Sequence, residues 1–281
     1  MKKIVIAGGS GYIGQAFYKK YKDQYHIKIL SRNQSQENFF ITSLEECDVL
    51  INLAGQSIFP TRWTNHNKQK ILDSRVKYSE DLLNHASSHK INHYIQASAI
   101  TFYPFSSSRK FIETMDKQKG QNFSLKLVQD WESKVDKSNI KNNTILRLGI
   151  VMGQKSKFLE PIKSLFNLYL GGMIGDGKQW VSWIHIDDVT SVIDYVIQNK
   201  IIGPLNLTAP NPITNANMSS TIARTIRRPN YLHMPKFFYK LLFGESSELL
   251  TEGHQVFPKL LIDKGYKFKY SYFKDSLNDS I

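Results

Sequence analysis

The sequence of 281 residues has few of the features that mark secreted, membrane-spanning or metal-binding proteins. Its single cysteine, Cys47, excludes an internal disulfide framework and favours a reducing compartment, so we expect a cytoplasmic protein. No apolar run approaches the roughly 20 residues of a membrane span, and the glycine-broken start is too short for a signal peptide. One cysteine and eight dispersed histidines give no ligand spacing typical of a metal site.

Acidic residues are also scarce, and the resulting net charge is +13. The lysines are scattered among Asn, Ser and Ile and do not line one predicted helix face, so we expect no nucleic-acid partner. A diffuse positive field of this kind attracts small anionic ligands.

Strand-like and helix-like segments alternate through the first half of the chain, which predicts an α/β fold with a doubly wound, parallel Rossmann-type sheet. After Gly153 the alternation gives way to shorter segments rich in proline. We expect a nucleotide-binding domain over 1–155, to which the chain returns at about 178–205. A smaller, mostly helical region over 156–281 would then lie on the substrate side.

The stretch GGSGYIG directly follows the first predicted strand and opens the first predicted helix. Gly8 permits a tight turn, Gly11 lets the backbone approach a pyrophosphate, and Gly14 lets the helix and strand pack closely. The N–H groups at the helix start would then face phosphate groups. The residues predicted to contact a dinucleotide here are Gly8, Gly9, Ser10, Gly11, Tyr12, Ile13 and Gly14.

The end of the second predicted strand indicates which dinucleotide binds. NAD-binding folds carry an acidic residue there for the ribose 2′-hydroxyl, whereas this chain has Ser31 and Arg32. Arginine pairs with a 2′-phosphate, so we expect NADP(H) rather than NAD(H). The alternative for Arg32 is a surface side chain that points into water.

These motifs resemble the extended short-chain dehydrogenase/reductase superfamily. KIVIAGGSGYIG is similar to its N-terminal fingerprint, LINLAG to its fourth-strand segment, and WIHIDDV to its later His-x-Asp-Asp stretch. RWTNHNKQKILDSRV and GESSELLTEGHQVFPKLLIDKGYKFKY resemble, more narrowly, the epimerase-family proteins that carry a C-terminal domain of unknown function. The resemblance implies an NADP-binding oxidoreductase or epimerase, with further cofactor contacts from Asn52, Leu53, Ala54 and Gly55.

The chain departs from this superfamily where the catalytic Tyr-x-x-x-Lys pair would fall. Phe123 occupies the tyrosine position and Leu127 the lysine position, and neither side chain can transfer a proton. Lys126 is one residue away, so on a helix it points about 100° from the required direction. The position of the family's serine holds Ala99.

Three hydroxyl groups near the end of the predicted strand INHYIQASA are candidate substitutes. Tyr103 has acid/base chemistry and lies where open α/β sheets bind ligands. Ser98 and Thr101 could hold a substrate carbonyl. The alternatives are ring packing for Tyr103 and hydrogen bonds within the loop for the other two.

Four further residues are candidates on the substrate side. Arg62 and Trp63 would suit an anionic, planar group, and Glu113 fits the pattern of the subgroup. Histidine side chains can titrate near neutral pH, which makes His185 a candidate; the alternative is that it orders a loop.

Two functions therefore remain open from the sequence. The first is an NADP(H)-dependent reductase or epimerase-like enzyme acting on a small carbonyl or hydroxyl compound. The second is a non-catalytic NADP(H)-binding sensor or scaffold, which the missing Tyr-Lys pair favours. The sequence indicates neither the substrate nor the oligomeric state.

Overall fold

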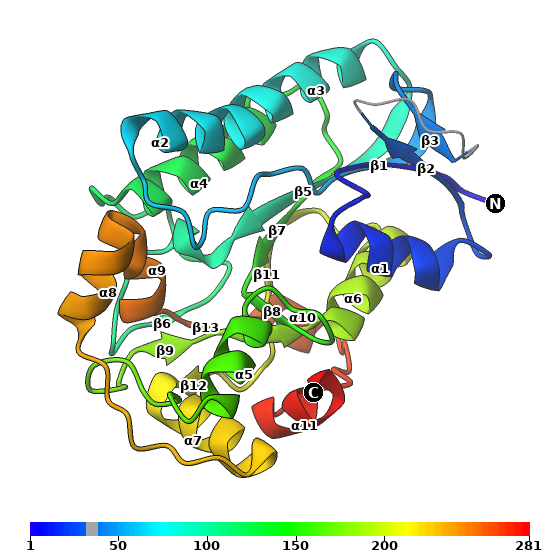
Figure 1. Ribbon diagram of the computed structural model, residues 1–281. Coiled ribbons are helices and arrows are strands. Elements are labelled where there is room, and N and C mark those ends of the chain that lie inside the picture. The colour runs from blue at the N-terminus through cyan, green and yellow to red at the C-terminus, as the bar shows by residue number, and fades with distance from the viewer. Residues whose placement is uncertain (32–38) are drawn as a thin grey trace.

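Strand β1 (Lys3–Ala7) shows how the central sheet is built. Its side chains alternate between two hydrophobic cores, with Ile4 and Ile6 in one and Val5 and Ala7 in the other. Side chains on a strand alternate between its faces, so a strand that is apolar at every position is buried on both. The computed structural model describes residues 1–31 and 39–281, and Figure 1 shows this sheet between layers of helices.

The central sheet has seven strands in the order β11-β7-β5-β4-β1-β2-β3, and every neighbouring pair is parallel. The order reverses between β1 and β4, which is the switch point where doubly wound folds bind ligands. The predicted parallel Rossmann-type sheet is thus confirmed. Its other strands are β2 (His26–Leu30), β3 (Phe40–Ile41), β4 (Cys47–Asn52), β5 (Ile91–Ala99), β7 (Asn143–Leu148) and β11 (Gly203–Leu207).

Helices cover both faces of the sheet (Figure 1). Helices α1 (Tyr12–Tyr21) and α6 (Ile186–Asn199) contribute Phe17 and Val189 to the core that holds Ile4 and Ile6. Helices α3 (Tyr78–Ser87) and α4 (Phe123–Asp136) supply the opposite core.

The apolar positions Ile71, Val76, Leu82 and Leu83 have helical periodicity and predict one long helix over 67–89, but this segment contains an irregular turn. Helix α2 (Asn65–Leu72) passes into a π-helical turn, Asp73–Lys77, before α3 begins. A π-helical turn inserts one extra residue into the helix and redirects its side chains, and such turns are frequent at functional sites.

The remaining elements form a smaller region beside the carboxyl ends of the sheet strands (Figure 1). Three short strand pairs join β6 to β13, β8 to β10 and β9 to β12. No helix in the ranges 1–31 and 39–281 is long and apolar enough to cross a membrane. The elements of this region are β6 (Lys110–Phe111), β8 (Ile150–Met152), α5 (Leu159–Asn167), β9 (Trp180–Val181), β10 (Trp183–His185), β12 (Ile213–Thr214), α7 (Asn215–Ile226), α8 (Lys236–Phe243), α9 (Glu248–Thr251), β13 (Gln255–Val256), α10 (Lys259–Asp263) and α11 (Phe273–Ser280).

Candidate functional site

The turn after β1 lies directly against the loop after β4. Gly8 adopts the left-handed φ of +77°, and a Cβ atom there would lie 2.6 Å from the backbone nitrogen of Ala54. Both the φ angle and the contact require glycine at this position. The loop between β1 and α1 and the loop after β4 therefore meet at the switch point of the sheet.

The other two glycines of the motif face different surroundings. A Cβ on Gly14 would lie 2.5 Å from the Cα of Gly9, so this glycine lets α1 pack against the turn. A Cβ on Gly11 would meet only the carbonyl oxygen of Gly8, at 3.1 Å. Gly11 is the exposed N-cap of α1, so the helix opens with its backbone accessible to a ligand.

A cavity of about 900 Å³ opens in front of this turn. Its volume lies at the upper end of the range for small-molecule sites, as a dinucleotide requires. Its walls come from the ends of β1, β2 and β4 and from the helical segment 70–78. The lining residues are Gly8, Ser10, Gly11, Leu30, Ser31, Leu53, Ala54, Gly55, Gln56, Lys70, Asp73, Ser74 and Tyr78.

The structure brings only part of the predicted cofactor set to the cavity wall. Gly8, Ser10, Gly11, Ser31, Leu53, Ala54 and Gly55 line it. Arg32 lies outside the described residues. The predicted residues that do not line the cavity are Gly9, Tyr12, Ile13, Gly14 and Asn52.

Asn52 supports the cavity from behind and does not face it, which corrects its expected place. The side chain is fully buried, and its amide donates to Ser79, Tyr94 and Gln96 at 2.9–3.2 Å. Its Oδ1 accepts a hydrogen bond from the backbone N–H of Ala54 at 3.1 Å. Asn52 therefore fixes the loop that touches Gly8, through partners that the sequence pattern did not indicate.

The π-helical turn supplies cavity residues that the sequence analysis missed. Asp73 and Ser74 line the cavity, and the Ser74 hydroxyl accepts a hydrogen bond from the backbone N–H of Gln56 at 3.2 Å. The apolar periodicity of 67–89 carried no sign of this turn. The family-like stretch RWTNHNKQKILDSRV overlaps the turn, and this resemblance was the available indication that the segment is functional.

Arg75, from the same turn, places a cation behind the cavity wall. Its guanidinium would lie 3.1–3.3 Å from a Cβ on Gly55, and it stacks over Trp131 at 5.4 Å. Burial lowers the pKa of Arg75 to about 10, and within the described chain no carboxylate forms an ion pair with it. An unpaired, largely desolvated guanidinium favours an anionic neighbour.

Two of the three candidate hydroxyls belong to a buried polar network. Glu132 receives two hydrogen bonds from Arg147, at 2.9 and 3.0 Å, and one from the hydroxyl of Ser98 at 2.5 Å. Arg147 also donates to the Tyr103 hydroxyl at 2.9 Å, and that hydroxyl donates to Asn206 at 2.9 Å. All five side chains are almost completely buried.

This network removes the grounds for Tyr103 as the proton donor. The Tyr103 side chain does not line the cavity in front of the glycine turn, and its ring stacks on that of Phe111 with the centroids 5.0 Å apart. Burial raises the pKa of Tyr103, although Arg147 opposes the shift. The structure therefore agrees with the alternative for Tyr103, in which its ring packs in the protein interior.

Thr101 differs from the other two hydroxyls. It lies in the 3-10 turn Ile100–Phe102 that directly follows β5, at the carboxyl edge of the sheet. Its buried Oγ1 has no hydrogen-bond partner among the residues that the structure describes. A buried hydroxyl without a partner is uncommon, and each instance requires an explanation.

Three of the substrate-side candidates also have structural partners. Trp63 is buried, donates to the carbonyl of Ile58 at 3.0 Å and packs edge-on against Phe123. Arg62 donates to the carbonyl of Leu241 at 3.0 Å. Glu113 accepts from the backbone N–H of Asn206, and burial raises its pKa. None of these three lines the cavity in front of the glycine turn.

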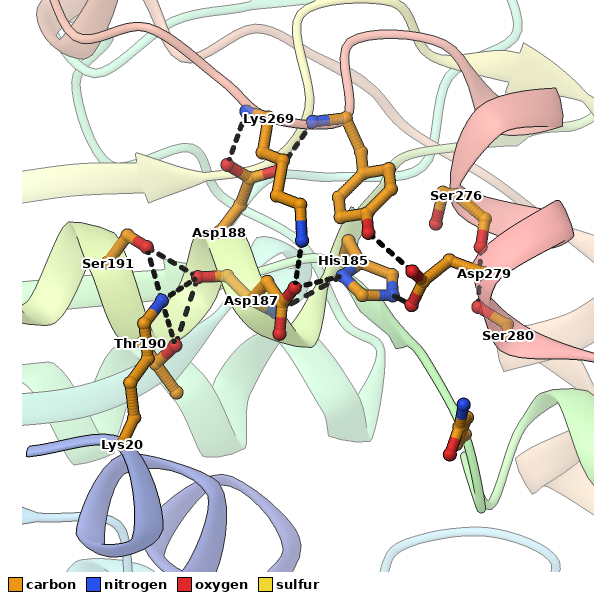
Figure 2. Close-up of polar contacts among 12 residues, drawn as sticks. Lys20, His185, Asp187, Asp188, Thr190, Ser191, Lys269, Ser276, Asp279 and Ser280 are labelled. Carbon is orange, nitrogen blue, oxygen red and sulfur yellow. Dashed lines mark hydrogen bonds and ion pairs between the residues drawn. The ribbon is translucent and has the colours of Figure 1, made fainter.

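His185 is the N-cap of α6, as Figure 2 shows. Its Nδ1 accepts from the backbone N–H of Asp187 at 3.2 Å, and its Nε2 lies 3.3 Å from a carboxylate oxygen of Asp279 on α11. Burial lowers the pKa of His185 even though both aspartates oppose the shift. The ring therefore caps α6, packs against the Tyr270 ring with the centroids 4.0 Å apart, and lies outside the cavity in front of the glycine turn.

The positions of the family's catalytic pair have become part of an apolar cluster. Leu127 is buried together with Trp63 and Ile71, and Phe123 packs against them. Lys126 points to solvent, as its helical position predicts. Neither of the two positions carries a proton donor, although the Lys68 ammonium lies 5.0 Å from the centroid of the Phe123 ring.

The described residues contain no group of three or more His, Cys, Asp or Glu side chains placed to hold a metal ion.

Comparison with known proteins agrees with this architecture. The sequence profile of the NAD dependent epimerase/dehydratase family matches residues 4–207, and that of DUF1731, a domain of unknown function, matches 234–280. Epimerase family protein YfhF of Bacillus subtilis is 35% identical, over 99% of this chain and 97% of that protein. The chloroplastic SDR39U1 homologue of Arabidopsis thaliana is 30% identical, over 98% of this chain and 85% of its own.

Two solved structures share the fold over nearly the whole chain. Human epimerase family protein SDR39U1, crystallised with NADPH, has a TM-score of 0.92, 24% identity and 98% coverage of both chains. The nucleoside-diphosphate sugar epimerase of Corynebacterium glutamicum has a TM-score of 0.82 and 25% identity, covering 99% of this chain and 58% of that one.

Proposed function

Because this chain belongs to the NAD dependent epimerase/dehydratase family, as its motifs predicted, we propose that it is an NADP(H)-binding oxidoreductase or epimerase-like protein. The dinucleotide would occupy the cavity at the carboxyl ends of β1 and β4. The substrate would be a small carbonyl or hydroxyl compound.

The observation that carries this proposal is the glycine cradle at the start of α1. Gly8 holds the turn against Ala54, and Gly11 leaves the helix N-terminus open toward a cavity of about 900 Å³. Backbone N–H groups at a helix N-terminus bind the phosphates of a dinucleotide. Arg75 adds positive charge behind Gly55.

NADP(H) is proposed over NAD(H) on two grounds. Ser31 lies at the end of β2 and lines the cavity, and the sequence continues into Arg32 without an acidic residue. Human SDR39U1, which shares the fold, was crystallised with NADPH.

When bound, the nicotinamide ring supplies or accepts the hydride. The protein must then hold the substrate oxygen at the carboxyl edge of the sheet. Of the three candidate hydroxyls, that of Thr101 lacks a partner among the described residues, whereas Ser98 and Tyr103 have partners in the buried network. The Thr101 hydroxyl is itself buried and does not line the cofactor cavity, so its claim rests on the missing partner and on its place after β5. We therefore place Thr101 first as the hydrogen-bond donor to the substrate oxygen.

We also propose that residues 1–155, with the return at about 178–205, form the NADP-binding domain, and that 156–281 form the substrate side. The family profile that ends at residue 207 and the place of β11 in the central sheet support this division. The single, buried Cys47 supports a cytoplasmic location.

Replacing Gly11 by valine should abolish NADPH binding and leave the fold intact. NADPH at 100 times its dissociation constant adds about 2.7 kcal/mol of stability, so the wild-type melting temperature should rise by roughly 5 °C. The new side chain would project from the open side of the turn and exclude the pyrophosphate. Differential scanning fluorimetry with NADPH and NADH measures this, and Gly120→Val, in a segment outside the cofactor cavity, is the control. If neither cofactor moves the wild-type melting temperature, the cradle does not bind a dinucleotide.

Replacing Thr101 by valine should lower turnover at least tenfold without lowering stability, since its hydroxyl has no described partner to lose. Tyr103→Phe should instead lower stability, because it removes hydrogen bonds to Arg147 and Asn206. Both variants are assayed by NADPH oxidation with the best substrate from a panel of aldehydes and ketones. Full activity of Thr101→Val would exclude this role, and loss of activity only in Tyr103→Phe would restore tyrosine as the donor.

A non-catalytic NADP(H) sensor is the second candidate function. The observation that favours it is the apolar cluster at Phe123 and Leu127, which leaves the family's acid/base positions without a proton donor. A melting shift with NADPH, combined with no turnover across carbonyl compounds and sugar nucleotides, would identify this function.

A further inference from the structure

A second cavity lies between α5, α7 and α8, beside the carboxyl ends of the sheet strands. Its volume is about 310 Å³, at the lower end of the range for small-molecule sites. Ile162 and Leu165 from α5, Met218 and Ile222 from α7, and Tyr239 and Phe243 from α8 line it.

The few polar groups of this cavity mostly have partners already. Glu252 forms an ion pair with Lys236 at 3.1 Å, and the Asn215 side chain accepts from the backbone N–H of Ile174 at 2.8 Å. The Ser219 hydroxyl donates to Asn230 at 2.7 Å. Lys157 is the one cation in the wall as described. A diphosphate needs several charge-assisted hydrogen bonds, which this wall does not offer.

One loop reaches both the apolar cavity and the cavity proposed for the cofactor. Gln56 lines the cofactor cavity and Phe59, three residues later on the same loop, lines the apolar one. Three residues span at most about 11 Å. On the other wall, Ile150 begins β8, and Gly149 alone separates it from the end of β7. The cavity therefore also reaches the carboxyl edge of the sheet.

We propose that this cavity binds the nonpolar body of the substrate, and that the substrate is an aryl or medium-chain alkyl aldehyde or ketone. This inference rests on the proposed function, and it assigns a substrate class different from the nucleotide sugars named for the Corynebacterium glutamicum structure. The carbonyl carbon accepts the hydride and the carbonyl oxygen takes a proton that water supplies. The products are the alcohol and NADP⁺.

Binding to the cavity can be measured without the cofactor. The neutral fluorophore 1-aminoanthracene should bind the full chain saturably, with an increase in its fluorescence. Leu165→Glu places a carboxylate in the cavity wall and should weaken this binding at least tenfold. The control is Leu168→Glu, three residues later, because Leu168 is 67% exposed and lies outside the cavity. Leu165 is itself 45% exposed, so its variant should fold, which thermal melting checks.

Turnover forms the second arm of the experiment. NADPH oxidation by benzaldehyde, nonanal and 2-decanone is compared with NADP⁺ reduction by UDP-glucose and UDP-glucuronic acid, whose sugars carry hydroxyl groups and no reducible carbonyl. The inference predicts activity on the first group, reduced at least tenfold in Leu165→Glu and unchanged in Leu168→Glu.

The outcomes separate this inference from the proposed function. Absence of saturable binding, equal weakening by both variants, or preferred turnover of the UDP-sugars would overturn the apolar-substrate inference. Binding that only Leu165→Glu weakens, with no turnover despite an NADPH melting shift, would support the apolar site and reject the oxidoreductase proposal.

Discussion

Replacing Glu132 by glutamine is expected to lower the free energy of unfolding by about 3–5 kcal/mol. The carboxylate forms a bidentate, buried ion pair with Arg147 and also accepts from Ser98. Glutamine keeps the shape but turns an N–H toward the guanidinium, which is left buried without a counter-charge. Urea denaturation followed by circular dichroism measures the change.

The matched control is Glu80→Gln, which breaks the surface ion pair with Lys134. Since Glu80 is 49% exposed, its loss should change stability by no more than about 1 kcal/mol. The double variant Glu132→Leu with Arg147→Met should regain part of the lost stability, because it removes both charges. Equal effects of Glu132→Gln and Glu80→Gln would mean that the buried pair is not a major source of stability.

Replacing Leu127 by lysine is expected to lower the free energy of unfolding by at least about 3 kcal/mol. The leucine is buried with Trp63 and Ile71, and no carboxylate belongs to this apolar cluster. The variant loses apolar burial and forces an ammonium group into a poorly solvated site. Thermal melting and urea denaturation measure the loss.

Asp130→Lys is the matched control, because it adds the same side chain to the exposed face of the same helix. Its effect on stability should be about 0.5 kcal/mol. If both lysine variants melt alike, the cluster around Leu127 is open enough to hold a hydrated ammonium group. If only Leu127→Lys is destabilised, restoring the family's pair with Phe123→Tyr and Leu127→Lys would also require changes to the residues that pack around these two positions.

The sheet and the glycine turn could be predicted because their signals are local. Ile4, Val5 and Ile6 form one continuous apolar run, and Gly8, Gly11 and Gly14 follow it at the spacing of a dinucleotide turn. These patterns depend on side-chain alternation and backbone freedom, which neighbouring residues determine.

The roles of the catalytic candidates could not be predicted, because their partners lie far along the chain. Tyr103 forms hydrogen bonds with Asn206 and Arg147, which are 103 and 44 residues away in the sequence. Nothing in the stretch SAITFYP indicates either partner. Asn52 likewise depends on Ser79 and Gln96. The π-helical turn at Asp73–Lys77 could not be predicted, because the apolar pattern of 67–89 was interpreted with a period of 3.6 residues throughout.

The contacts at the start of α6 also bear on the order in which the chain folds (Figure 2). The carboxylate of Asp188 accepts hydrogen bonds from the backbone N–H groups of Lys269 and Tyr270, which are 81 and 82 residues later. During synthesis, this carboxylate is therefore buried against its partners only after those residues have left the ribosome. Closing such long loops slows folding, so the layer of α1 and α6 should reach its native packing late, together with the C-terminal segment.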